Sequence, residues 1–248
     1  FIEDKARKLD CYKHLYHKYN GDADSINYYL NLPHEVTLFD YDGPKKAVMS
    51  TMDSIRYMVK FMHTGFVALE PDTRHIKAWV GDIDYRSWKY DKVTAMRQPG
   101  STFKIFVYAA AMNAGLSPCD MRRDEYVGMQ VFDKKKNKEV LWAPHNANGY
   151  FTGDSMTLRA AFAQSVNSIA VKTGMEVGID NVVKAAHDMG IHSPLDNQPA
   201  LTLGSSDVTL LELVNSYATV VADGKEQEPV MVTKIIDRNG KVIYDEKK

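Results

Sequence analysis

Apolar residues recur with the spacing of one helical face in several segments of the chain. The segment that begins at Thr51 shows this clearly, since Ile55, Met58 and Met62 repeat near the helical period. The same pattern predicts further helices near residues 2–19, 157–164, 168–177 and 180–189 and after Ser101. The capping-box sequence "TLLE" at residues 209–212 predicts one more.

Alternating apolar and polar positions predict strands in the rest of the chain. Two β-like runs, residues 66–70 and 75–80, are joined by the turn "PDTR" and indicate a hairpin. Another β-like run lies within residues 125–144, and an Asn-Gly turn at residues 239–240 indicates a hairpin near the end. Residues 31–50 are interpreted as an extended connector with a Gly-Pro break. This order of elements predicts an α/β fold of the α+β type with an antiparallel sheet.

Length and composition describe an ordinary folded protein of 248 residues, with 44% apolar and 25% charged side chains. The formal net charge of −1 argues against a nucleic-acid partner. Cys11 and Cys119 are too few for a disulfide framework, and no segment reaches the ~20 apolar residues that cross a bilayer. Because the chain starts with Phe1 and shows no signal peptide, we expect a fragment of a longer protein.

The stretch "RQPGSTFKIFVYAAAM" brings a serine and a lysine to the start of an apolar helix. Ser101 and Lys104 are three residues apart and therefore share one helical face. Burial and the positive end of the helix dipole both favour a neutral lysine amine. Such an amine can take the proton of the serine and make it a nucleophile. The structural alternative is that Ser101 caps the helix while Lys104 extends to water.

A second hydroxyl lies in "AAFAQSVNSIAV". Ser165 and Asn167 are two residues apart, so an extended loop between two helices would direct both side chains to one cleft. The serine could then relay a proton to a leaving amine, and the amide of Asn167 could hold a peptide carbonyl. The alternative is that Ser165 caps the following helix.

Together these segments resemble the transpeptidase domain of penicillin-binding proteins. The resemblance is carried by "RQPGSTFK", by "WAPHNANG", by the order of helix, S-x-N and helix in "MTLRAAFAQSVNSIAVKTG", and by "LTLGSSDVTLLELVNSYATVVADGK". It covers roughly residues 65–248 and implies a β-lactamase/transpeptidase-like fold, an antiparallel sheet flanked by helices plus a mostly helical subdomain that carries the nucleophile. Residues 65–248 would be the N-terminal part of that domain, and residues 1–64 a linker with a leading helix.

The resemblance also implies roles for four side chains. Ser101 would be the acylated nucleophile, Lys104 its general base, Ser165 the proton shuttle and Asn167 the residue that positions the substrate backbone. The implied reaction cross-links peptidoglycan stem peptides: a D-Ala-D-Ala donor acylates the serine, D-alanine leaves, and an amine acceptor resolves the ester. β-Lactams would acylate Ser101 too. No cofactor or metal is implied.

The third motif of the family, K-T-G, is expected on a sheet strand far downstream of S-x-N. This chain has "KTG" at residues 172–174, where the surrounding pattern is helical, so we interpret the match as coincidence and expect the true motif beyond Lys248. Other functions on the same scaffold are a β-lactamase or D,D-carboxypeptidase, and a non-catalytic β-lactam sensor. The block at residues 201–225 favours the transpeptidase.

Two further expectations concern the cellular location of the protein and a possible metal site. The substrate class implies the cell envelope, at the extracytoplasmic (periplasmic) face of the inner membrane, with membrane anchoring in the parent protein rather than in this chain. The sequence "CYKHLYHKY" places Cys11, His14 and His17 at three-residue spacing. A zinc site needs a fourth ligand and none is evident nearby, so we interpret these side chains as one polar helix face.

Overall fold

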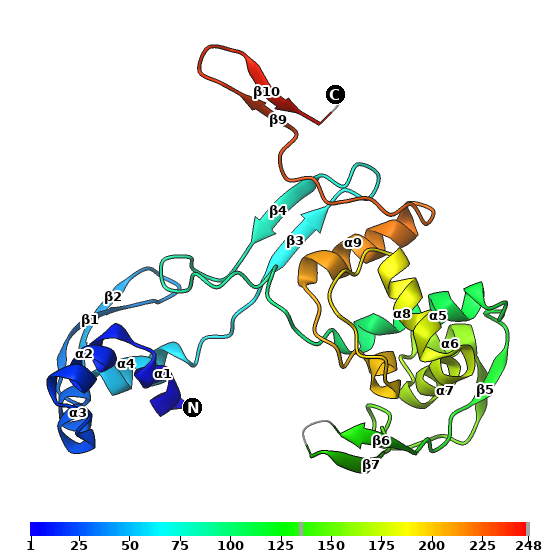
Figure 1. Cartoon of the computed structure of the whole chain (residues 1–248), viewed down its shortest axis with the longest axis horizontal. Coiled ribbons are helices and arrows are strands. Elements are labelled where there is room, and N and C mark those ends of the chain that lie inside the picture. Colours follow the sequence, from blue (N-terminus) through cyan, green and yellow to red (C-terminus); the bar gives the residue numbers. More distant parts are fainter. Residues whose placement is uncertain (134–135, 247–248) are drawn as a thin grey trace. The chain divides into compact units, whose positions relative to one another are not determined.

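The computed structural model describes residues 1–133 and 136–246 of the chain (Figure 1). They divide into two compact units. The first unit comprises Phe1–Thr64 and Asp82–Tyr90, and the second comprises Gly65–Gly81 and Asp91–Lys248. No helix in the described part of the chain combines the length and the apolar character that a membrane crossing requires.

The first unit contains four helices and one hairpin, drawn in blue in Figure 1. The elements are α1 (Ile2–Arg7), α2 (Asp10–Lys18), α3 (Ala23–Leu30), β1 (His34–Leu38), β2 (Lys45–Met49) and α4 (Thr51–Met58). Strands β1 and β2 are antiparallel. A small core holds the unit together and buries Ala6, Ile26, Leu30, Met52 and Ile55.

Three predictions for this unit were wrong. The helix that begins at Thr51 ends at Met58, before the Met62 that the apolar pattern includes. The single helix expected over residues 2–19 is interrupted, because Leu9 has an extended backbone and starts a new helix. Helix α1 packs on α4 while α2 packs on α3, so tertiary contacts override the continuous local pattern. The connector expected over residues 31–50 is the β1–β2 hairpin. Its strands are mostly exposed, and this kept the alternation of apolar residues weak.

The strands of the second unit form antiparallel two-stranded ladders. They are β3 (Phe66–Leu69) with β4 (Ile76–Val80), β5 (Met121–Arg123) with β8 (Ser155–Thr157), β6 (Met129–Asp133) with β7 (Lys138–Trp142), and β9 (Lys234–Ile236) with β10 (Val242–Asp245). The hairpins predicted at residues 66–80 and around the Asn-Gly turn are confirmed. The β-like run within residues 125–144 is the β6–β7 hairpin.

The helices of the second unit mostly pack against α5. They are η1 (Gly100–Phe103), α5 (Lys104–Asn113), α6 (Leu158–Ala163), α7 (Asn167–Val177), α8 (Ile179–Asp188), η2 (Pro199–Leu203) and α9 (Leu210–Val221), where η marks a 3₁₀ turn. The predicted helices are confirmed within two residues at their ends. The capping box is confirmed too, because the Thr209 hydroxyl accepts the Glu212 N–H and the Glu212 carboxylate accepts the Thr209 N–H.

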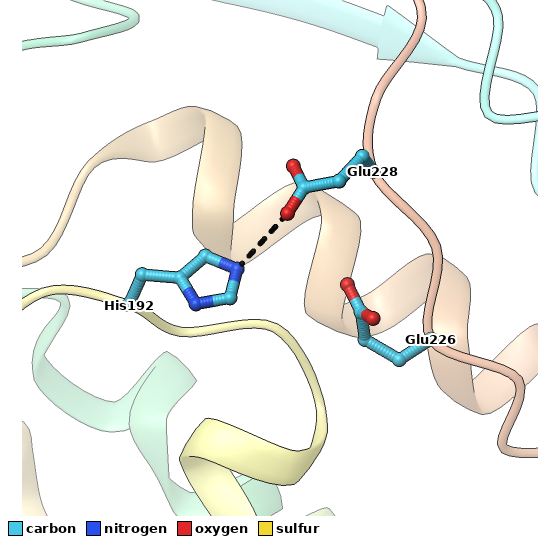
Figure 2. Close-up of side chains that lie close together, drawn as sticks. All are labelled: His192, Glu226 and Glu228. Atoms are coloured by element: carbon cyan, nitrogen blue, oxygen red, sulfur yellow. Dashed lines mark ion pairs between the residues drawn. The ribbon is translucent and has the colours of Figure 1, made fainter.

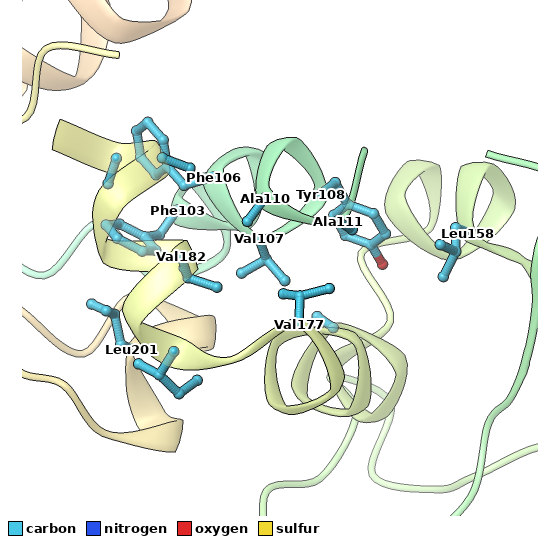
Figure 3. Packing of buried hydrophobic residues seen from close by; sticks show 14 of the residues in the cluster. Phe103, Phe106, Val107, Tyr108, Ala110, Ala111, Leu158, Val177, Val182 and Leu201 are labelled. Atoms are coloured by element: carbon cyan, nitrogen blue, oxygen red, sulfur yellow. The ribbon is translucent and has the colours of Figure 1, made fainter. Parts of the chain in front are cut away.

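Helix α5 is buried on nearly all sides, and this determines where the candidate site lies. Its side chains Phe106 and Val107 are fully buried and pack with Val182 of α8 and Leu201 of η2 (Figure 3). A helix that is apolar all round must be enclosed by other elements. The first residue of α5, Lys104, is therefore drawn into the protein rather than into water, with 1% of its surface exposed.

Candidate active site

Ser101 lies in the 3₁₀ turn η1, immediately before α5. The preceding Gly100 has φ 59°, and the backbone of Gly204 lies so close to it that a Cβ on Gly204 would overlap the Gly100 main chain. Tyr217 of α9 donates a hydrogen bond to the Thr102 carbonyl and ties the turn from the other side. Ser101 itself is exposed, and its hydroxyl has no hydrogen-bond partner within residues 1–133 and 136–246.

Lys104 is buried among neutral oxygen acceptors. Its Nζ donates to the Ser165 carbonyl at 2.7 Å, the Ser165 Oγ at 3.0 Å and the Asn167 Oδ1 at 2.6 Å. Burial lowers the pKa of Lys104 from 10.5 to about 8, because it disfavours the charged amine. The alternative that Lys104 extends to water is wrong.

Ser165 lies in the connection between α6 and α7 and has a left-handed backbone, with φ 56°. Its N–H bonds to the Phe162 carbonyl, and the N–H of Val166 bonds to the Ala161 carbonyl. These two bonds end α6 in a Schellman motif with a serine where glycine is usual. The alternative that Ser165 caps α7 is wrong, because the N-cap residue is Val166. The left-handed turn instead directs the Ser165 hydroxyl to Lys104.

Asn167 is the first residue of α7, and both ends of its side-chain amide are held. Oδ1 accepts from Lys104, and Nδ2 donates to the carbonyl of His145 at 2.8 Å. Nδ2 carries a second hydrogen that remains for a ligand. The structure thus joins three of the four predicted side chains, those of Lys104, Ser165 and Asn167, by hydrogen bonds. Ser101 stands one 3₁₀ turn before Lys104. The Lys104 backbone N–H donates to the Ser101 carbonyl, whereas no hydrogen bond joins the two side chains among the described residues.

Residues that the sequence analysis did not select support this arrangement from behind. Asn146 accepts hydrogen bonds from the backbone N–H groups of Asn167 and Ser168, and the buried carboxylate of Asp124 accepts from Asn146. The segment "WAPHNANG" contains Asn146 and was noted for its resemblance to the family. Asp124 had no such signal, because it lies in a charged stretch, "MRRDE", without periodicity.

The "KTG" at residues 172–174 lies in the middle of α7, which confirms the helical interpretation. The Lys172 amine donates to the Glu125 carboxylate at 2.6 Å and to the Arg123 carbonyl at 2.9 Å. Gly174 packs so closely on η2 that a Cβ there would overlap the Thr202 methyl group. Lys172 therefore serves a surface ion pair, and Gly174 serves helix packing.

One trio of possible metal ligands lies close together, apart from the site described above. The ligand atoms of His192, Glu226 and Glu228 all lie within 4.8 Å of one another, and His192 pairs with Glu228 at 3.4 Å (Figure 2). All three side chains are exposed, and exposed acidic groups commonly gather without an ion. No second feature of the described residues points to a cation there.

Comparisons with known proteins give the chain its family. Residues 64–248 match the family model of the penicillin binding protein transpeptidase domain, and residues 1–62 match that of the penicillin-binding protein middle domain. Penicillin-binding protein 2D of Bacillus subtilis is 36% identical over 185 residues, 74% of this chain and 26% of that protein. Penicillin-binding protein 1A of Rickettsia prowazekii is 37% identical over 179 residues, 72% of this chain and 22% of that protein. The chain spans about a quarter of the length of these curated relatives.

Solved structures give the fold. Penicillin-Binding Protein 1A from Haemophilus influenzae matches 74% of this chain with 27% of its own, at a TM-score of 0.66 and 30% identity. PonA1 from Mycobacterium tuberculosis matches 99% of this chain with 64% of its own, at a TM-score of 0.63 and 19% identity, which shows the fold alone. The fold class expected from the sequence, β-lactamase/transpeptidase-like, is confirmed.

Proposed function

This chain belongs to the penicillin-binding protein transpeptidase family, and we propose that it carries the nucleophile and the proton-transfer groups of a serine D,D-transpeptidase. Ser101 is the nucleophile, Lys104 the general base, Ser165 the proton shuttle and Asn167 the residue that positions the substrate backbone. The observation that carries this proposal is the Lys104 amine. It is buried, it lies one turn from Ser101, and it donates to both Ser165 Oγ and Asn167 Oδ1.

Acylation uses these groups in order. Neutral Lys104 takes the proton of the Ser101 hydroxyl while the serine oxygen attacks the carbonyl carbon between the two D-alanines of a donor stem peptide. Negative charge develops on that carbonyl oxygen, and the backbone N–H of Ser101 supplies one hydrogen bond to it. When the C–N bond breaks, the proton passes from Lys104 through Ser165 to the departing amine. D-alanine leaves, and an ester on Ser101 remains.

The second half of the reaction reverses these proton transfers. An amine of a neighbouring stem peptide attacks the ester carbonyl and loses a proton through Ser165 to Lys104. The bond between the carbonyl carbon and the Ser101 oxygen breaks, and the serine recovers its proton. The product is a new peptide bond, which is the cross-link. The left-handed turn at Ser165 supports this shuttle, because it keeps the hydroxyl 3.0 Å from the amine.

The proposed reaction also implies that β-lactams are ligands and that the parent protein lies in the cell envelope. A β-lactam presents an amide carbonyl to Ser101, and its ring opening leaves an ester that no amine acceptor reaches. Peptidoglycan stem peptides are joined outside the inner membrane, so we place the parent protein in the cell envelope, at the periplasmic face, with a membrane anchor of its own. Residues 65–248 form the first part of the transpeptidase domain, and residues 1–64 the segment that leads to it.

Intact mass measurement of the whole protein that contains this chain, after incubation with benzylpenicillin, tests the proposal. We expect one penicilloyl group per chain, absent in Ser101→Ala and retained in Ser205→Ala, which removes an exposed serine of a neighbouring turn. An adduct that persists in Ser101→Ala would overturn the assignment of the nucleophile. An adduct lost within seconds would favour a β-lactamase, because that enzyme hydrolyses its ester rapidly.

A further inference from the structure

The first turn of α7 has no capping side chain of its own. Its N-cap residue is Val166, which offers no side-chain hydrogen bond, although the first N–H groups of a helix need acceptors. The acceptor comes from a distant loop. Oδ1 of Asn146 accepts the backbone N–H of Asn167 at 3.0 Å and that of Ser168 at 3.2 Å. Asn146 therefore acts as a non-local N-cap for α7.

Asn146 is held in turn by a buried carboxylate. Its Nδ2 donates to Oδ1 of Asp124 at 2.8 Å, and the same oxygen accepts the Ser168 hydroxyl at 2.6 Å. Oδ2 of Asp124 accepts the Thr152 N–H at 2.9 Å. Burial raises the pKa of Asp124, but these hydrogen bonds outweigh it and lower the pKa below the ordinary value. The ionised carboxylate also lies near the helix end that favours negative charge.

Asn167 joins this cap to the reacting groups. Its backbone N–H is fixed by Asn146, and its side chain is fixed by Lys104 at one end and by the His145 carbonyl at the other. His145 directly precedes Asn146 in the chain. One loop therefore holds both the backbone and the side chain of Asn167, and the loop is in turn held by Asp124.

We propose that Asp124 and Asn146 are positioning residues for acylation, which fix Asn167 and, through it, the Lys104 amine in the reactive geometry. This inference rests on the proposed function, since it concerns the arrangement of the same site. Both residues lie behind the site, with 1% and 9% of their surfaces exposed. They act through Asn167, and a displacement of about 1 Å at the reacting groups can slow a reaction about 100-fold.

The test measures acylation of the whole protein by a fluorescent penicillin and separates the dissociation constant of the non-covalent complex from the first-order acylation step. We expect Asn146→Ala to slow that step about 30-fold while the dissociation constant changes less than about threefold. Asp124→Asn is expected to slow it about tenfold, because the amide has one acceptor oxygen where the carboxylate has two, and it cannot serve both Asn146 and the Thr152 N–H.

A reciprocal exchange provides the rescue experiment. Asn146→Asp alone brings two carboxylates together and is expected to impair acylation at least as much as Asn146→Ala. Combined with Asp124→Asn, it restores one donor and one acceptor between the two positions, while the new carboxylate still accepts from the first N–H groups of α7. The Tyr150 carbonyl still loses the hydrogen bond that Asn146 Nδ2 donates at 3.1 Å, so the double variant should regain part of the acylation rate lost in Asn146→Asp.

The matched control removes an asparagine of α8 that caps the other end of α7. The side-chain Nδ2 of Asn181 donates to the Val177 carbonyl at 2.7 Å, in the last turn of α7. Asn181→Ala should lower the thermal stability and leave the acylation step within about twofold of the unaltered protein. A milder probe of the cap is Ser168→Ala, which removes only one of the donors to Asp124.

The outcomes separate the positioning role of Asn146 and Asp124 from the proposed function. If Ser101 is labelled, but Asn146→Ala and Asn181→Ala acylate equally fast at an equal loss of stability, the positioning role is wrong and the proposed function stands. If the unaltered protein is not labelled at Ser101, the proposed function fails and the inference fails with it. If Asn146→Ala does not fold, Ser168→Ala and the double variant test the positioning role instead. The proposal is contradicted if Ser168→Ala leaves the acylation step unchanged and the double variant acylates no faster than Asn146→Asp.

Discussion

Two lysines of this chain occupy motif-like sequences, and the structure gives them opposite environments. Lys104 of "STFK" is 1% exposed and donates only to neutral oxygens, so burial lowers its pKa to about 8. Lys172 of "KTG" is half-buried on α7 and donates to the carboxylate of Glu125 at 2.6 Å. The hydrogen bond from Lys172 in turn lowers the pKa of Glu125.

The two environments show that burial, together with the hydrogen-bond partners, determines whether a lysine can act as a base. A carboxylate stabilises the ammonium form and makes the lysine a structural cation, whereas burial among hydroxyl, carbonyl and amide oxygens favours loss of its proton. Of these two lysines, Lys104 is the one whose amine has a hydroxyl within hydrogen-bond distance among the described residues, and it can exchange that proton with it. The sequence "KTG" at residues 172–174 matches the letters of a motif, but it does not place Lys172 in such an environment.

Replacing each of the two lysines in turn is expected to give the largest difference in acylation rate. Lys104→Ala removes the proposed base for Ser101 and is expected to slow penicillin acylation by about 10³-fold. Lys172→Ala removes a partly exposed ion pair and should leave acylation within about twofold, with less than about 1 kcal/mol of stability lost. Stopped-flow kinetics measure the acylation rate of each variant, and thermal unfolding measures its stability. Equal losses of acylation in the two variants would contradict the distinction.

The pH dependence should follow Lys104 alone. Acylation needs its neutral form, so the second-order rate constant should rise with pH through a midpoint near 8, with about one tenth of the chains active at pH 7. Between pH 8 and 10.5 the unfolded chain binds more protons at this lysine than the folded chain, so the free energy of unfolding should rise with pH there. A rate that is flat from pH 6 to 9 would be inconsistent with a lysine base.

Ser165→Gly should separate activity from stability. Glycine adopts the left-handed backbone of residue 165 more readily than serine does, which is expected to stabilise the fold by up to about 1 kcal/mol. The loss of the hydroxyl should slow acylation about 10- to 100-fold, because the proton shuttle is gone. Differential scanning calorimetry measures the expected gain in stability, and acylation kinetics measure the expected loss of rate. Unchanged acylation would remove Ser165 from the mechanism.

Gly174→Ala tests the packing role of the "KTG" segment at residues 172–174. It has the smallest expected effect on acylation. The new methyl group meets the Thr202 methyl, and we expect a loss of about 1–3 kcal/mol of stability. Thr202→Ser in the same chain should restore part of it by removing that methyl. Acylation per folded molecule should stay within about twofold. A variant as stable as the original would show that the close contact between α7 and η2 is absent.

The sequence predicted the parts of the site that local patterns express. The i, i+3 spacing of Ser101 and Lys104, the apolar helix behind them and the S-x-N between two helices all identify residues that lie at the candidate site. The capping box at Thr209 and the two hairpins with clear turns were equally local. Each of these signals lies within a window of about a dozen residues, which is the range over which periodicity and turn chemistry act.

The rest depends on contacts between residues far apart in the chain. Asp124, Asn146 and Ser168 meet in one buried network, and nothing in their neighbouring residues indicates that they are partners. The left-handed serine at residue 165 could not be foreseen, because glycine usually occupies that position of the motif. The break at Leu9 reflects packing of α1 and α2 on different helices, which is likewise non-local.

The central claim is that burial gives Lys104 an amine that is partly neutral near neutral pH, and direct titration of that amine tests it most closely. Lysines labelled with ¹³C at Cε would be followed by NMR across pH, with the Lys104 signal assigned by its absence in Lys104→Arg. The account predicts a midpoint near pH 8 for Lys104, well below that of ordinary lysines. A midpoint near 10.5 would show that Lys104 stays charged, and it could not then be the base that activates Ser101.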